Sequence, residues 1–246
     1  MQYEVKGTDM PMLEMQLERG EAVYTESGGM AWMTDGIAMK TSGRGGLGKM
    51  LGRALAGESL FLTTYTCEAA QATIVFTPEA PGHIIPLPLQ AGQSMIAQKD
   101  AFMVAEDDVQ IEMHFRKRLG AGLFGGEGFI LQKLTGPGMA FVEIAGEVVQ
   151  YELQPGQVMK VDPGHIAMYE PTVDYDVEMV RGVTNMFFGG EGLFLATLRG
   201  PGRVWLQTMP LANLAGAIRR YLPTSGGAER GGDIGGNLVR GIFDNL

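Results

Sequence analysis

A seven-residue pattern recurs along the chain, and this internal repetition constrains the fold more than any other feature. Residues 89–95 (LQAGQSM) match residues 153–159 (LQPGQVM), which lie 64 positions later, and residues 17–23 (LERGEAV) are a weaker copy 72 positions earlier. Self-similarity at a nearly fixed period is the signature of one structural unit repeated within a chain. We therefore predict three copies, over residues 1–80, 81–145 and 146–210, followed by a tail over residues 211–246.

A second motif keeps the same spacing. Residues 125–131 (GGEGFIL) match residues 189–195 (GGEGLFL), and residues 56–62 (AGESLFL) are a weaker version. Glycine on both sides of an acid indicates a structural turn, in which the carboxylate accepts hydrogen bonds from its own loop. The alternative is that the three acids meet near a pseudo-threefold axis and bind a cation. The residues of this predicted turn are Gly126, Glu127, Gly128, Gly190, Glu191, Gly192 and Glu58.

Each copy has the hydrophobic pattern of short β-strands. Val109, Ile111, Met113 and Phe115 alternate with polar residues, which is the period of a sheet with one buried face. About six such runs occur in each copy, separated by glycine, proline and aspartate, as in a rolled β-sandwich. We therefore predict an all-β protein with its three copies in a pseudo-threefold arrangement.

Two stretches depart from the β pattern. Residues 44–55 are rich in glycine and then amphipathic, which predicts a short inserted helix. Residues 211–222 have apolar positions at helical spacing, which predicts a C-terminal helix that is docked on the β-core and ends before Pro223. The remaining tail is rich in glycine and is predicted to be loosely attached.

Composition excludes several classes of function. The net charge of −9 disfavours nucleic-acid binding, which needs a basic surface. The chain contains no run of 18 uncharged apolar residues, so we expect no membrane span. Its one cysteine, Cys67, cannot form an internal disulfide, and the N-terminal residues lack a targeting pattern. These features favour a cytoplasmic location.

Apolar residues also gather just before the glutamate motifs, together with lysine and arginine. Such loops on one face of an acidic protein predict an interaction surface, for another subunit, a protein partner or an anionic membrane surface. The alternative is that these side chains fold back and close the ends of the β-rolls. The candidate residues are Leu47, Met50, Leu51, Leu123, Phe124, Phe187 and Phe188.

The GGEG motifs and the LxxGQ turns resemble those of the mitochondrial-biogenesis protein family, over about residues 1–210. The motif around Glu58 departs from this pattern, with Ala56 and Ser59 in place of glycine. The resemblance implies the fold of the tryptophan RNA-binding attenuator protein, a double-stranded β-helix, repeated in tandem. It implies no catalytic residue, because the family has none to transfer, and of its members the bacterial ones match a chain without a presequence.

We therefore expect a non-enzymatic protein that assembles as a homo-oligomer and acts either as a scaffold or as an interaction module next to a membrane. Catalytic residues, a metal and a cofactor are not expected, because the histidines have no partner at ligand spacing. One alternative is small-molecule or cation binding in a pocket between copies, with Glu127 and Glu191 as polar anchors. Another is RNA binding by analogy of fold, against which the acidic charge counts.

Overall fold

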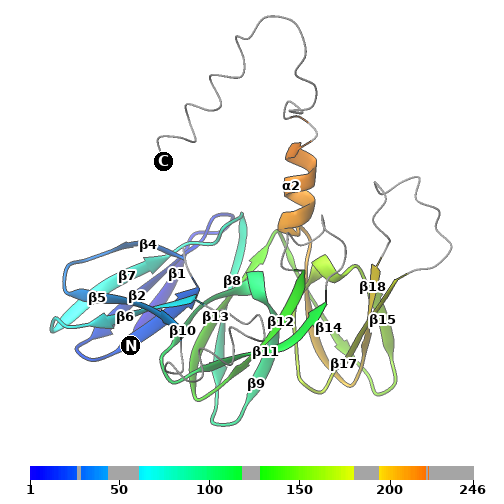
Figure 1. Ribbon diagram of the computed structural model, residues 1–246, viewed down its shortest axis with the longest axis horizontal. Coiled ribbons are helices and arrows are strands. Elements are labelled where there is room, and N and C mark those ends of the chain that lie inside the picture. Colours follow the sequence, from blue (N-terminus) through cyan, green and yellow to red (C-terminus); the bar gives the residue numbers. More distant parts are fainter. Residues whose placement is uncertain (27–28, 44–60, 118–127, 180–193, 220, 222–246) are drawn as a thin grey trace, which may run out of the picture. The chain divides into compact units, whose positions relative to one another are not determined.

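The structure is a computed structural model that describes residues 1–26, 29–43, 61–117, 128–179, 194–219 and 221. These residues form antiparallel strands, two short 3-10 turns and one helix (Figure 1). The prediction of an all-β protein with a short C-terminal helix is confirmed. The predicted helix over residues 44–55 lies outside the described residues.

The strands fall into three consecutive groups, which we call segments 1, 2 and 3. Segment 1 contains β1 (Gln2–Lys6), β2 (Met12–Glu18), β3 (Ala22–Glu26), β4 (Met30–Met33), β5 (Ile37–Gly43), β6 (Phe61–Cys67) and β7 (Gln71–Phe76). Segment 2 contains β8 (Gly82–Leu89), β9 (Ser94–Gln98), η1 (Lys99–Ala101), β10 (Phe102–Glu106), β11 (Gln110–Lys117), β12 (Phe129–Thr135) and β13 (Gly138–Ala145). Segment 3 contains β14 (Val148–Leu153), β15 (Val158–Val161), η2 (Pro163–His165), β16 (Ile166–Tyr169), β17 (Asp174–Met179), β18 (Phe194–Arg199) and β19 (Gly202–Gln207).

Each segment contributes two three-stranded ribbons in the same strand order. The first ribbons are β4-β7-β2, β10-β13-β8 and β16-β19-β14, and the second ribbons are β5-β6-β3, β11-β12-β9 and β17-β18-β15. The second ribbon of segment 1 joins the first ribbon of segment 2 in a six-stranded sheet, and segments 2 and 3 are joined in the same way. A four-stranded sheet, which also contains β1, and a three-stranded sheet complete the set. Neighbouring segments therefore share sheets.

The core consists of three apolar clusters, each between two successive sheets. Leu13 and Phe141 belong to the cluster between the four-stranded sheet and the first six-stranded sheet. Leu87 and Trp205 belong to the cluster between the two six-stranded sheets. The third cluster lies between the second six-stranded sheet and the three-stranded sheet. The packing follows from the alternation of apolar and polar residues along each strand, because alternate side chains point to opposite faces.

The LxxGQ motif is a turn closed by its own last side chain. The backbone amide of Gln90 donates to the side-chain oxygen of Gln93 at 3.1 Å, and that of Gln154 donates to Gln157 at 2.9 Å. In segment 1 the Glu18 amide donates to a glutamate instead, at 2.8 Å. The glycine within each turn has a positive φ of 77–87°, which favours a residue without a Cβ atom. The repeated motif therefore encodes a turn.

The C-terminal helix α2 (Leu211–Arg219) begins directly after Pro210 and ends earlier than the sequence predicts. Its docking on the β-core stays a prediction, and Ile218 is 51% exposed. The chain divides into two units, Met1–Leu214 and Ala215–Leu246. The boundaries of the three predicted copies and their pseudo-threefold arrangement also stay predictions. The chain's one cysteine, Cys67, is a buried free thiol, as expected from its count.

Candidate interaction site

Two strand pairs join the segments, and both have the same register. Between β3 and β10, Tyr24 lies opposite Ala105. Between β9 and β16, Ile96 lies opposite Tyr169, and these two residues are 72 and 64 positions beyond Tyr24 and Ala105. The contact from one segment to the next is therefore a specific antiparallel strand pair that occurs twice.

The first and the last segment each contain one strand that is equivalent to these joining strands but is an edge strand. β4 of segment 1 has the place of β10 and β16 in its ribbon, and it is the last strand of the four-stranded sheet. β15 of segment 3 has the place of β3 and β9, and it is the last strand of the three-stranded sheet. In the part of the chain that the structure describes, neither strand has a neighbour on its outer side. The backbone groups on those sides are open to a further strand.

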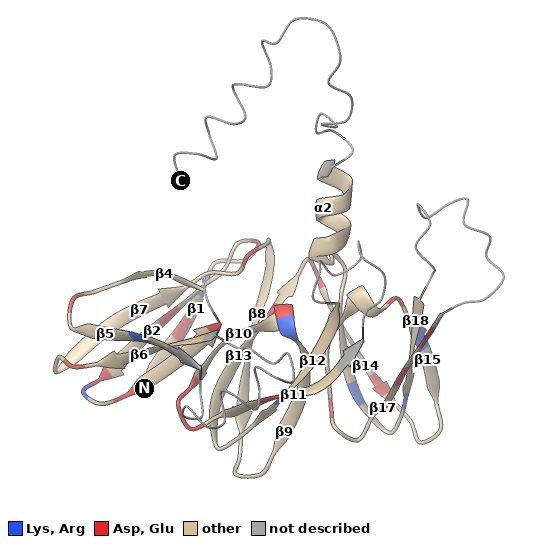
Figure 2. Ribbon diagram, viewed as in Figure 1, with Lys and Arg blue, Asp and Glu red and all other residues tan. Residues whose placement is uncertain are grey.

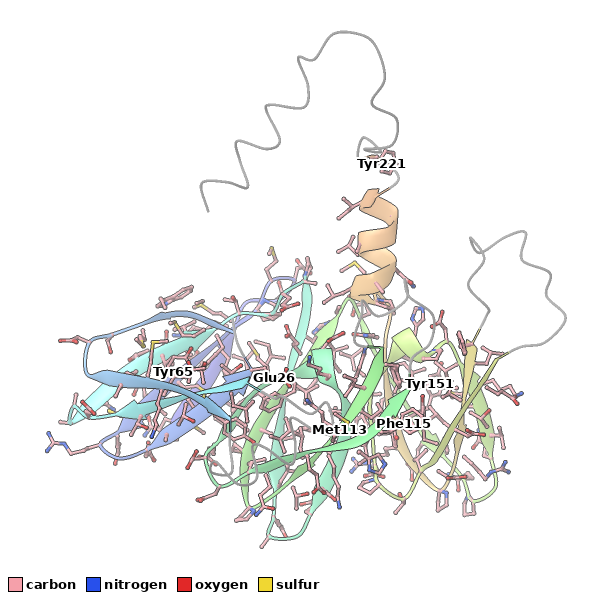
Figure 3. The ribbon with its side chains drawn as sticks, in the orientation of Figure 1. Glu26, Tyr65, Met113, Phe115, Tyr151 and Tyr221 are labelled. Carbon is pink, nitrogen blue, oxygen red and sulfur yellow. The ribbon has the colours of Figure 1, made fainter. Side chains whose placement is uncertain are left out.

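The sheet face beside β15 is uncovered. Tyr151 on β14 is 45% exposed, whereas the residues at its position in the earlier segments, Leu87 and Met15, are 7% and 0% exposed. Leu206 on β19 is half-buried, whereas its counterpart Val142 is fully buried. Leu87 and Val142 are covered because the next segment packs on them. Tyr151 is labelled in Figure 3, where its strand is the last of the second six-stranded sheet.

A hollow of about 620 Å³ lies on this uncovered face. Apolar side chains from β14, β15 and β19 line it together with polar residues, among them Asp162 and His165. The Asp162 side chain accepts a hydrogen bond from the Gly164 amide at 3.0 Å, and His165 Nδ1 lies 2.8 Å from the Gln207 carbonyl oxygen. The full lining is Val149, Tyr151, Met159, Lys160, Val161, Asp162, His165, Leu206, Gln207 and Thr208.

A matching exposure occurs on β4. Trp32 is 53% exposed, whereas Val104 and Met168, which have its place on β10 and β16, are fully buried. The backbone of Trp32 pairs with Val75 of β7, just as Val104 pairs with Phe141 of β13. A large aromatic side chain is therefore exposed on β4, which, unlike β10 and β16, has no outer neighbour among the described residues.

Most residues that the sequence singled out lie outside the described residues. This applies to all seven candidate loop residues and to Glu58, Gly126, Glu127, Gly190, Glu191 and Gly192. Gly128 is described, and its φ of 83° agrees with a backbone turn at that position. Among the described residues, no group of three histidine, cysteine or acidic side chains is arranged to hold a metal ion. The helix that the structure describes has nine residues, which are too few to cross a bilayer.

Sequence reasoning did not single out Trp32, Tyr151 or Leu206. Aligning the copies places Tyr151 at the position of Leu87, but the alignment carries no sign that only one of the two is covered. They are exposed because no further segment pairs with β4 or β15 in the described part of the chain. Only the order of the strands in the sheets shows this.

The fold defines a class of protein built from serially joined β-ribbons, in which the strand positions that join neighbouring segments are unpaired in β4 at one end and in β15 at the other. The model of the Mitochondrial biogenesis AIM24 family matches residues 3–209, and the chain belongs to that family. An uncharacterised protein of Streptococcus pyogenes serotype M6 is 31% identical over 229 residues, which cover 89% of this chain and 90% of the relative. The crystal structure of a Streptococcus pyogenes protein is similar with a TM-score of 0.73 and 26% identity, covering 90% of this chain and 99% of that one.

Proposed function

We propose that the protein is a non-enzymatic scaffold that assembles head to tail, with β15 of one copy pairing with β4 of the next. The observation that carries the proposal is that these two edge strands are the counterparts of the strands that already pair within the chain. Addition of a strand to an open sheet edge is a common mode of recognition, because the main-chain hydrogen bonds supply affinity. The partner is thus a second copy of this chain.

The internal pairs predict the register of this contact. Tyr24 and Ile96 correspond to Lys160 on β15, and Ala105 and Tyr169 correspond to Met33 on β4. Lys160 of one copy would therefore lie opposite Met33 of the next.

The uncovered faces support the same contact. In the internal junctions, the first ribbon of the following segment covers the residues equivalent to Tyr151 and Leu206. A following copy would cover these two side chains in the same way, and it would bring its own Trp32 to the position that Val104 and Met168 hold. Burial of apolar surface contributes roughly 25 cal/mol per Å². The contact therefore combines strand pairing with apolar packing.

The two surfaces differ, so the contact is heterologous. Repetition of such a contact gives a closed ring where the rotation between copies closes, and an open filament where it does not. Either product presents many copies of the same loops in a regular array. That array is the physical basis of the proposed scaffold, whose cytoplasmic location and additional partners stay predictions.

Cysteine cross-linking tests the contact. The full chain with Met33→Cys and Lys160→Cys is oxidised at micromolar concentration, with Met33→Cys and Val158→Cys as the matched control. Directly opposite residues have Cβ atoms about 4.5–5.5 Å apart, whereas diagonal neighbours are about 7–8 Å apart. We expect a ladder of covalent multimers for the first pair and little for the control. The proposal would be overturned if light scattering gave the monomer mass of 26.5 kDa for the wild-type chain and the first cysteine pair formed no cross-link.

A further inference from the structure

Two glutamine side chains form hydrogen bonds at the junction between segments 2 and 3, where β9 pairs with β16. Gln207 on β19 accepts a hydrogen bond from the Ala145 amide at 3.2 Å, and its amide nitrogen donates to the Gly164 carbonyl at 2.8 Å. The same nitrogen donates to the side-chain oxygen of Gln98 at 3.3 Å. Both glutamines are buried, with exposed fractions of 8% and 5%. A primary amide donates and accepts without titrating, so these contacts are independent of pH.

The junction between segments 1 and 2 has a glutamate at the matching position. Glu143 on β13 lies 64 positions before Gln207. Its carboxylate accepts a hydrogen bond at 2.8 Å from the backbone amide of Glu79, in the linker that leads into β8. Gln207 accepts from the amide of Ala145, the last residue of β13, directly before the linker that leads into β14. Both side chains therefore accept a hydrogen bond from a backbone amide at successive junctions, but only Glu143 can change its charge.

The groups around Glu143 are mostly acidic. Glu79 approaches it from the linker, and Asp100 approaches it from η1, whose basic and acidic residues are coloured in Figure 2. Lys99 of η1 is paired with a different acid, because its Nζ lies 3.8 Å from the carboxylate of Glu26. Glu26 itself accepts a hydrogen bond from a glutamine of β12 and occupies the position that Gln98 has at the next junction. Acids thus replace the neutral groups of the second junction.

This environment favours the neutral form of the side chain. Burial raises the pKa of the Glu143 carboxyl to about 7; the hydrogen bond from the Glu79 amide lowers it, and the negative charges of Glu79 and Asp100 raise it further. The protonated carboxyl has nearly the shape of the glutamine amide, and it carries one donor and one acceptor. Protonated Glu143 can therefore make the kind of contacts that Gln207 makes.

We propose that Glu143 makes a proton-sensitive contact that stabilises the junction between segments 1 and 2, where β3 pairs with β10. When protonated, Glu143 holds the Glu79 amide as Gln207 holds the Ala145 amide at the next junction. When ionised, it places a poorly compensated charge beside Glu79 and Asp100 and loosens the linker before β8. The inference is independent of the proposed assembly, because all of these groups lie within one copy.

The direction of the pH effect follows from the raised pKa. The folded chain binds the proton more tightly than the unfolded chain, whose glutamate has the ordinary pKa of 4.5. The contribution of Glu143 to the free energy of unfolding is therefore fully present below pH 4.5, and it is lost as the pH rises through about 7.

Thermal unfolding of the full chain between pH 5 and pH 8 tests the proposal, with Glu143→Gln and Gln207→Glu compared with the wild type. We expect the Tm of the wild type to fall by about 5 °C more than that of Glu143→Gln over this range. We expect Gln207→Glu to steepen the fall, because it adds a second titrating side chain. An equal pH slope for the wild type and Glu143→Gln would overturn the proposal.

A direct titration keeps the test decisive where a variant fails to fold. The ¹³C resonance of the Glu143 carboxyl in the wild-type chain is followed by NMR from pH 4 to pH 9. A titration midpoint near pH 7 supports the proposed proton-sensitive contact, and a midpoint near the ordinary value of 4.5 overturns it.

Discussion

Tyr151 and Leu87 have the same position on β14 and β8, 64 residues apart, yet Tyr151 is 45% exposed and Leu87 is 7% exposed. Both are large side chains with an apolar body, so their different exposure reflects their neighbours. Leu87 lies in a cluster with Trp205 of the following segment. Segment 3 is followed by no further segment in the described part of the chain. Tyr151 therefore lies on a surface that elsewhere in this fold is the inside of a junction.

The first prediction concerns this surface. Tyr151→Asp should weaken assembly, because a carboxylate at the centre of an apolar contact loses its hydration without gaining a partner. Loss of a buried aromatic contact corresponds to roughly 1.5–3 kcal/mol, or about a 10- to 200-fold weaker association. Analytical ultracentrifugation over a range of concentrations measures this change.

Gln150→Asp is the matched control for this prediction. It adds the same charge on the same strand, but on the opposite face, and Gln150 is exposed. We expect it to leave association unchanged. Equal weakening by both variants would show that negative charge on β14, rather than the face of Tyr151, determines association.

The secondary structure was predictable from local signals, whereas the sheets were not. The alternation around Ile111 and the turn glycines at positions 20, 92 and 156 specify strands and turns through neighbouring residues. The pairing of Tyr24 with Ala105 joins residues of different segments, and no local pattern encodes it. The repeats predict three copies but not how these are joined, which the structure shows as sheets that pass from one segment to the next.

The candidate site was harder to predict for a physical reason. The sequence predicts an interaction surface from apolar residues in loops, such as Phe124 and Phe187, which lie outside the described residues. Trp32 and Tyr151 lie in strands whose pattern predicts burial, and their counterparts Val104 and Leu87 are buried. Exposure of such residues depends on whether a neighbouring segment exists, which is a property of the tertiary structure.

The second prediction concerns the LxxGQ turn. Gln157→Ala should destabilise the chain by about 0.5–1.5 kcal/mol, because it removes the acceptor of the Gln154 amide. Gln157→Glu should cost less at pH 7, since Glu21 accepts the equivalent hydrogen bond in segment 1. Urea unfolding measures both variants. A loss for Gln157→Glu as large as that for Gln157→Ala would contradict the proposed role of the side-chain oxygen.

The third prediction separates two reasons for a glycine. A Cβ atom at Gly200 would lie 2.5 Å from the carbonyl oxygen of Gln154, whereas one at Gly156 would meet no atom within 4 Å, although Gly156 has a φ of 77°. Gly156→Ala should therefore cost about 1 kcal/mol through backbone strain alone. Gly200→Ala should cost more, about 2–3 kcal/mol, because the backbone must move. Thermal unfolding ranks the two variants, and the reverse order would refute the argument.

The last prediction concerns two hydroxyl groups inside segment 3. The side chains of Tyr169 and Tyr175 stack at a ring distance of 5.9 Å, and in the described part of the chain their buried hydroxyls have no hydrogen-bond partner. Burial raises the pKa of both phenols, so both are neutral at neutral pH. A buried hydroxyl without a partner costs roughly 1–3 kcal/mol.

Tyr175→Phe should therefore leave the Tm unchanged or raise it by a few degrees. Tyr24→Phe is the contrasting variant, because the Tyr24 hydroxyl donates to the Val109 carbonyl at 2.9 Å. Its loss should lower the free energy of unfolding by about 1 kcal/mol. Differential scanning calorimetry compares the two variants at the same pH. A decrease for Tyr175→Phe as large as that for Tyr24→Phe would mean that the Tyr175 hydroxyl is hydrogen-bonded in solution, with an ordered water as the simplest partner.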